Sequence, residues 1–117
     1  MIQYQHWSED IRMLITDEQN HGSVHVCIPK KAEDRPAHGR ADALIHNLWV
    51  DEQHRGHGVA KRLLETAEKE ARHHGVKSVA LAWEKVDSPL WVLHWYERLG
   101  YDEAEFSNHS SLLVKRL

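Results

Sequence analysis

The sequence lacks the features of a membrane or secreted protein. No stretch approaches the roughly 20 apolar residues that a membrane-crossing helix needs, and residues 1–6 have neither the basic start nor the apolar run of a signal peptide. Cysteine is equally scarce, because Cys27 is the only one and has no internal partner for a disulfide. We therefore expect no membrane association and a cytoplasmic location.

The chain also lacks an excess of positive charge. It carries 15 basic and 18 acidic residues, a formal net charge of −3, so there is no electrostatic case for a nucleic-acid partner. Low-complexity runs are absent, and the composition of 41% hydrophobic and 28% charged residues is typical of globular proteins. The 117 residues fit a single domain spanning 1–117, which can bury a real core.

What the sequence has in abundance is histidine, with 11 residues. Three close pairs occur, and they are His21 with His25, His54 with His57, and His73 with His74. None has the His-Glu-x-x-His or Cys/His spacing of a zinc site, so we expect solvated surface histidines and no metal.

The first half of the chain reads as strands. Residues 10–16 and 23–28 alternate apolar and polar side chains, which predicts an antiparallel hairpin preceded by a strand at 2–7. Residues 29–40 contain proline, glycine and several charges and are expected to form a loop. Residues 41–50 are almost continuously apolar, which is typical of a strand covered on both faces.

A helix is expected to begin at Gly58 and to end at Gly75, a residue suited to a left-handed C-terminal cap. Apolar residues recur along it at helical spacing. Glu68 and Arg72 stand four residues apart, in the order that favours a surface ion pair. Residues 76–83 form the next strand, and strand–helix–strand implies a parallel crossover.

A second helix is predicted over 88–99, with Ser88 as N-cap and proline at the first helical position. Its tryptophans Trp91 and Trp95 are expected to build the core together with Trp83. Two closing strands, 101–106 and 111–117, complete the chain. The fold class is therefore α/β: a mixed sheet with antiparallel N-terminal strands, one parallel β-α-β crossover, a second helix and C-terminal strands.

The segment between the buried strand and the first helix carries the clearest chemistry. It runs Gln-His-Arg-Gly-His-Gly-Val-Ala over residues 53–60. The first amides of a helix have no internal partners and lie at the positive end of its dipole, and glycines let a bulky anion approach them. This pattern predicts a phosphate site. A triphosphate-binding loop is excluded by its missing motif, and the dinucleotide fingerprint fails because Lys61 stands where glycine or alanine is needed.

What fits is Arg-x-x-Gly-x-Ala, from Arg55 through Gly58 to Ala60. The segment resembles the pyrophosphate loop of the GNAT superfamily of acetyl-CoA-dependent N-acetyltransferases. Downstream, Trp-Tyr-Glu-Arg-Leu-Gly-Tyr at 95–101 resembles a second signature of that family. The resemblance covers about residues 43–117. It implies transfer of an acetyl group from acetyl-CoA to a primary amine, with acetyl-CoA as cosubstrate and no metal.

The resemblance implies roles for individual residues. The cofactor-binding set is Leu48, Trp49, Val50, Arg55, Gly56, His57, Gly58, Val59, Ala60 and Ser88. Tyr96 matches the tyrosine that protonates the departing thiolate. A main-chain N–H near Trp49 or Val50 is expected to stabilise the oxyanion. The amine must lose a proton, for which His46 is the first candidate base, Glu84 the second and Asp42 the third. A hydrogen-bonded core position is the alternative for His46.

Two departures from the family pattern concern the acceptor. Typical members have two helices between their first and second strands, whereas the 41 residues before Asp42 show no helical period. The Asn that often begins the last helix is replaced by Ser88. Either a partner subunit in a homodimer completes the pocket, or the acceptor is itself large, such as a protein lysine or N-terminus. The competing interpretations are a non-catalytic CoA-binding or interaction module and a histidine-rich metal-binding protein.

Overall fold

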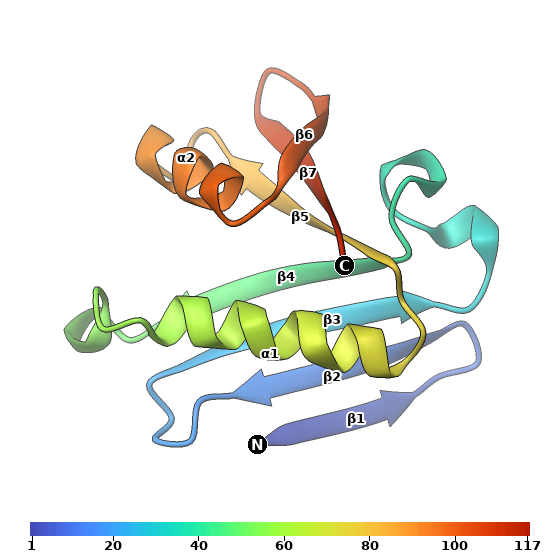
Figure 1. Ribbon diagram of the computed structural model, residues 1–117, viewed down its shortest axis with the longest axis horizontal. Helices are drawn as coiled ribbons and strands as arrows, with labels where there is room; N and C mark the ends of the chain where they lie inside the picture. The colour runs from blue at the N-terminus through green and yellow to red at the C-terminus, as the bar shows by residue number, and fades with distance from the viewer.

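The structure is a computed structural model that describes residues 1–117, and it contains one seven-stranded sheet with the strand order β1-β2-β3-β4-β5-β7-β6 (Figure 1). The strands are β1 (Ile2–His6), β2 (Asp10–Thr16), β3 (Gly22–Pro29), β4 (Ala43–Val50), β5 (Ser78–Glu84), β6 (Asp102–Phe106) and β7 (Ser110–Arg116). The helices are α1 (Val59–His73) and α2 (Leu90–Arg98). The mixed sheet and two helices confirm the fold class expected from the sequence. Neither helix has the length and apolar character needed to cross a bilayer.

Strands β1 to β4 form an antiparallel meander, as the alternating side chains predict. Their inward-facing residues, including Met13, Ile15, Val24 and Val26, are fully buried under α1. The β2–β3 turn contains Asn20 with a φ of 60°, a conformation that asparagine tolerates better than most residues. The predicted loop between β3 and β4 contains two short 3-10 turns, at Ala32–Asp34 and Ala37–Gly39.

Helix α1 makes the crossover between the parallel strands β4 and β5. Gly75 follows it with a φ of 79°, which confirms the left-handed cap. The two strands pair only at Ala43 with Val79 and at Leu44 with Ala80. Beyond these residues they diverge, and α2 lies beside the wide end of the opening (Figure 1).

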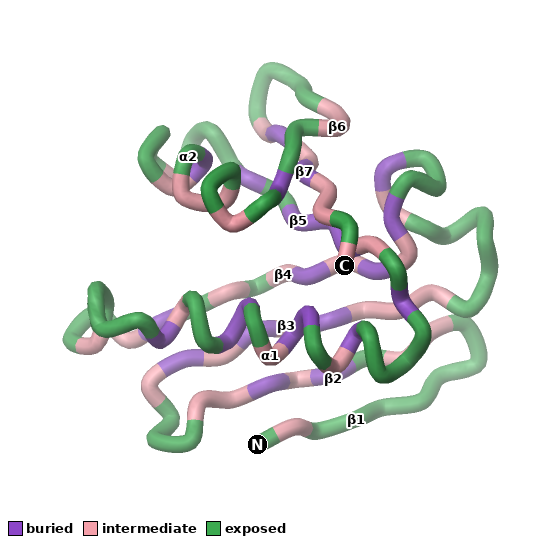
Figure 2. Tube along the Cα trace, in the orientation of Figure 1, coloured by how far each residue is buried: buried purple, intermediate pink, exposed green.

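Both helices cover the same face of the sheet. Leu63, Leu64 and Ala67 of α1 share one buried cluster with Leu93 of α2 and with Tyr101. The buried segments in Figure 2 accordingly lie along β2, β3 and the inner side of α1. The opposite face of β1–β4 therefore carries no helix, in agreement with the absence of helical periodicity before residue 42.

Two predictions about α2 were wrong. The helix begins at Leu90, and Pro89 rather than Ser88 is the N-cap residue, because the backbone of Pro89 is extended with a ψ of 157°. Pro89 makes no side-chain hydrogen bond to the helix. Trp91 is 66% exposed, since it lies on the outer face of a helix that buries only Leu93 fully. Trp83 is buried and Trp95 packs against the core, as expected.

The predicted surface pair of Glu68 and Arg72 was also wrong. Glu68 is buried and accepts hydrogen bonds from the Tyr101 hydroxyl at 2.7 Å and from Lys115 Nζ at 3.0 Å. Burial and the Glu68 carboxylate raise the pKa of Tyr101 far above its usual value, so the phenol remains a donor. These contacts join α1 to β7 and to the segment after α2.

Replacing Glu68 with alanine should destabilise the fold by about 3 kcal/mol, because it leaves the Lys115 ammonium and a buried phenol without their acceptor. Urea unfolding followed by circular dichroism measures this change. Glu65→Ala is the matched control, since Glu65 is exposed on the same helix, and its effect should stay within about 0.5 kcal/mol. Equal effects of the two variants would contradict the structural role of Glu68.

Candidate active site

The divergence of β4 and β5 opens a cavity of about 350 Å³ between them. Five residues chosen from the sequence line this cavity: His46, Leu48, Glu84, Ser88 and Tyr96. They come from three elements and from the β5–α2 loop, so only the tertiary structure brings them together. The remaining lining residues are Leu44, Ile45, Asn47, Leu64, Leu81, Ala82, Trp83 and Asp87.

The lining residues belong to both faces of the sheet. Leu64 of α1 and Tyr96 of α2 approach from the helix side. Side chains alternate along a strand, so Glu84 points away from the face on which Trp83 is buried. His46 likewise lies opposite the core residue Ile45. The cavity therefore runs through the sheet, from the helix side to the open face.

A β-bulge shapes the β4 wall of the cavity. The pairing of β3 with β4 shifts between Ser23–Trp49 and His25–His46, which leaves one extra residue in β4. Asn47 lies in this bulge with a φ of 53°. The bulge reverses the alternation, so that Val50 faces the core and Trp49 is 53% exposed. Sequence reasoning missed it, although an asparagine inside an apolar strand was a usable signal.

Tyr96 provides a protonated hydroxyl on the helix side. Its ring lies 5.3 Å from Trp95 and 6.2 Å from Tyr101 between ring centroids. Burial raises the pKa of Tyr96 above its usual value of 10.0, so the phenol is protonated at neutral pH. A group in this state can give a proton to a stronger base that forms beside it.

His46 provides a neutral imidazole on the open side. Burial lowers the pKa of His46 below 6.5, and electrostatic interactions with His25 and Arg12 lower it further. The rings of His25 and His46, which are direct partners in the β3–β4 ladder, lie 5.3 Å apart. His46 is therefore unprotonated at pH 7 and free to accept a proton.

The loop before α1 provides a set of free amides. No main-chain N–H from residue 56 to residue 61 donates to another main-chain group. Gly56 and Gly58 have φ values of 82° and 80°, which L side chains adopt poorly. Arg55 Nε donates to the carbonyl of Val50 at 3.1 Å, and Arg62 Nη1 donates to the carbonyl of His57 at 3.2 Å. These two hydrogen bonds hold the loop in place. This arrangement fits a pyrophosphate.

A histidine stack beside this loop escaped sequence reasoning. His21 and His54 stack with ring centroids 3.4 Å apart, and His54 Nδ1 lies 3.4 Å from a carboxylate oxygen of Asp51. The two residues are 33 positions apart in the sequence, so no local pattern joins them. No group of three or more His, Cys, Asp or Glu side chains is arranged to hold a metal ion.

The third candidate base lies elsewhere. Asp42 accepts a hydrogen bond from the main-chain N–H of Lys77 at 2.9 Å and lies 3.6 Å from Arg35 Nη1. It therefore ties the paired ends of β4 and β5 together, away from the cavity.

Comparison with known proteins identifies the family of the chain. The sequence profile described as the acetyltransferase (GNAT) family matches residues 22–101. The chain belongs to this family. The matched segment contains the glycine loop, the bulged strand and both helices, so it includes both parts of the candidate site.

Individual relatives are more distant. An uncharacterized N-acetyltransferase of Methanocaldococcus jannaschii is 33% identical over 67% of this chain, but the match spans only 34% of that relative. The crystal structure of an acetyltransferase from Bacillus cereus has a TM-score of 0.67 at 22% identity, covering 93% of this chain and 74% of that one. An acetyltransferase from Bacillus anthracis in complex with acetyl coenzyme A has a TM-score of 0.67 at 18% identity, covering 97% and 66%.

Replacing Gly58 with aspartate should abolish saturable acetyl-CoA binding, because a carboxylate would repel phosphate and a side chain is strained at a φ of +80°. Isothermal titration calorimetry measures the loss. Gly39→Asp is the matched control, since Gly39 has a φ of +85° with nothing within 4 Å of an added Cβ and lies in the β3–β4 loop. Wild-type affinity in Gly58→Asp would remove the loop from the binding site.

Proposed function

We propose that this chain is an acetyl-CoA-dependent N-acetyltransferase that acts on a primary amine. The observation that carries the proposal is the distribution of groups around the cavity. A protonated phenol lies on the helix side and a neutral imidazole lies on the open side. The glycine loop lies at the start of α1, the helix whose Leu64 lines the cavity. The family supports the same chemistry.

The chain offers a continuous surface to acetyl-CoA. The free amides of residues 56–61, with Arg55 fixing the loop, would hold the pyrophosphate. Beyond Leu44 the edge of β4 that faces β5 has no partner strand. Apart from the Val50 carbonyl, which accepts from Arg55, main-chain groups of residues 48–50 on this edge would bind the pantetheine arm. Ser88 lines the far wall of the cavity. When bound, acetyl-CoA supplies the thioester carbonyl carbon as the electrophile.

The side chains divide the proton transfers between them. His46 accepts the proton of the amine as the amine nitrogen bonds to the acetyl carbon, with Glu84 as the second candidate base. Tyr96 gives its hydroxyl proton to sulfur as the carbon–sulfur bond breaks. A main-chain N–H near Trp49 or Val50 stabilises the negative charge that develops on the carbonyl oxygen. The products are the acetylated amine and free CoA.

The competing function is a CoA-binding module without transfer. Such a module needs the loop at 55–60 and gains nothing from an acid and a base on opposite sides of a cavity. The positions of Tyr96 and His46 therefore favour the enzyme. Binding of acetyl-CoA without acetylation of any amine in a broad panel would favour the module.

The cellular setting is also proposed. Cys27 is half-buried and unpaired, which fits the reducing cytoplasm. A homodimer remains a prediction, and the exposed Leu90 and Trp91 at the start of α2 offer an apolar surface to a second copy. The sheet face that no helix covers favours a large acceptor molecule over a small one.

Replacing Tyr96 with phenylalanine should lower kcat by about 100-fold while leaving acetyl-CoA affinity unchanged, because the ring remains and only the proton donor is lost. Initial rates of amide formation, followed by mass spectrometry, and calorimetry measure the two quantities. Tyr4→Phe is the control, since Tyr4 donates to Glu70 on the outside of the molecule. An unchanged kcat in Tyr96→Phe would exclude Tyr96 from the reaction.

Replacing His46 with alanine should remove the acidic limb of the pH–rate profile. His46 acts as a base only when its imidazole is neutral. In the wild type, kcat/KM should therefore be constant above the lowered pKa of His46 and should fall as the pH drops through that pKa, which lies below 6.5. The exposed His94 provides a control variant, His94→Ala, which should keep the limb. An acidic limb that survives in His46→Ala would assign the base to another residue, with Glu84 next to be tested.

A further inference from the structure

The sheet face opposite the helices is an ordered grid of side chains. Strand register places them in two rows across β4, β3, β2 and β1. The first row is His46, His25, Leu14 and Gln3, and the second is Leu44, Cys27, Arg12 and Gln5. All eight line one shallow cavity of about 440 Å³. No helix covers this face, so its side chains are available to a ligand.

This groove, hereafter the sheet-face groove, is continuous with the active-site cavity. His46 and Leu44 line both of them. The glycine loop lies at the start of α1, on the helix side of the sheet, so the cosubstrate approaches from there. The opening beside His46 on the other side is the one left for the amine. A molecule whose amine reaches His46 from this side must lie on the sheet-face groove.

The groove has the chemistry of a site for a neutral, hydrogen-bonding chain. Gln3 and Gln5 supply amide donors and acceptors, and Leu14 on β2 and Leu44 on β4 add aliphatic surface at two separate positions. The charge of Arg12 is balanced by Asp10, whose carboxylate accepts from Arg12 Nε at 3.0 Å and from Nη2 at 3.3 Å. A polyamine would need free carboxylates here and a polyanion would need free cations, and the groove offers neither.

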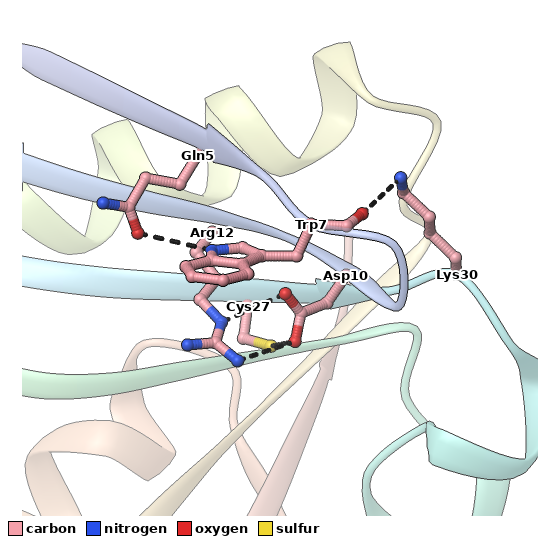
Figure 3. A network of polar contacts seen from close by, with 6 residues as sticks. All are labelled: Gln5, Trp7, Asp10, Arg12, Cys27 and Lys30. Atoms are coloured by element: carbon pink, nitrogen blue, oxygen red, sulfur yellow. Dashed lines mark hydrogen bonds and ion pairs between the residues drawn. The ribbon is translucent and has the colours of Figure 1, made fainter.

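Trp7 lies beside the end of the groove that Gln5 and Arg12 form. Its indole lies over the Arg12 guanidinium, 5.2 Å from the ring centroid, and its Nε1 donates to Gln5 at 3.4 Å (Figure 3). Lys30 Nζ donates to the main-chain carbonyl of Trp7 at 2.6 Å and fixes the β1–β2 turn. Trp7 is nevertheless 52% exposed, so a broad aromatic surface is held in place and left uncovered.

We propose that the acceptor is an extended peptide, which lies across the sheet-face groove with its amine beside His46 and its following residues running over β3 and β2 toward Trp7. The inference rests on the proposed acetyl transfer. Three strand spacings separate β4 from β1, about 14 Å, which an extended chain spans with about four residues. The peptide presents its N-terminal amine or a lysine amine.

The test measures kcat/KM against acceptor length with the full chain and acetyl-CoA. The acceptors are neutral alanine–serine peptide amides of one to eight residues, and amide formation is followed by mass spectrometry. We expect kcat/KM to rise roughly tenfold or more up to about five residues and then to level off, as the groove fills. N-terminally blocked peptides with one lysine form a second arm, which identifies the amine. Spermidine forms the third arm.

Trp7→Ala should reduce the advantage of five-residue over one-residue acceptors by roughly tenfold, because it removes the aromatic end of the groove. Tyr4→Ala is the matched control: Tyr4 is also an exposed aromatic of the first hairpin, 44% exposed, but it donates to Glu70 of α1 on the other face. Tyr4→Ala should keep the full length dependence. Thermal unfolding establishes that both variants are folded.

Several outcomes would overturn the inference. Transfer that is independent of peptide length, or faster to spermidine than to any peptide, would leave the transferase intact and remove the peptide from the groove. Acetyl-CoA binding with no transfer to any acceptor would remove the proposed function and the inference together. A dimer in sedimentation that Leu14→Arg dissociates would place a second copy on this face instead.

A binding measurement keeps the inference testable without turnover. In heteronuclear NMR spectra of the CoA-bound protein, a five-residue peptide should shift the signals of His25 and Leu14 and leave those of Tyr4 in place. Shifts confined to α2 would contradict the groove.

Discussion

The site depends on two strands that stop pairing. Strands β4 and β5 share hydrogen bonds at only two positions and then separate, which leaves main-chain groups unpaired along both facing edges. Each strand is held from its other side instead: β4 by the meander and β5 by seven consecutive pairs with β7. The opening therefore persists without a ligand, and its unpaired groups are available for hydrogen bonds to a cosubstrate.

An opening of this kind leaves the two halves of the sheet poorly connected, and buried side chains make the connection. Glu68 on α1 accepts from Tyr101, which follows α2, and from Lys115 on β7. The hydrophobic cluster beneath runs from Met13 on β2 to Leu113 on β7. The ring of Tyr96, the proposed proton donor, packs against Tyr101, with 6.2 Å between ring centroids. Tyr96 is therefore anchored to the part of the structure that bridges the opening.

Because both helices lie on one face, the sheet separates the two substrates in our proposal. The free amides of the glycine loop and the hydroxyl of Tyr96 lie on the helix side, while His46 and Glu84 lie on the open side. In the proposed reaction, proton donor and proton acceptor would therefore meet the reacting atoms from opposite directions. This division also explains why the open face need not be covered by a helix, since in our proposal the acceptor covers it.

Much of the fold was predictable because its signals are local. Each of these signals involves only a few neighbouring residues: the alternation in 10–16 and 23–28, the glycines at 58 and 75, and the Arg-x-x-Gly-x-Ala run. The structure has the strands, the helix and the free amides at these places. Other features depend on residues far apart in the chain. The two partners of Glu68, Tyr101 and Lys115, lie 33 and 47 positions away. The neighbours His25 and His46 are fixed by a register that includes the Asn47 bulge.

The sequence by itself therefore determined the elements, their order and the glycine loop with its free amides, since periodicity and glycine conformation are properties of neighbouring residues. Only the tertiary structure decided that Trp91 is exposed, that five of the candidate site residues line one cavity, and that one face of the sheet stays open. Those outcomes depend on which side chains are buried against one another, and this depends on the packing of the whole chain.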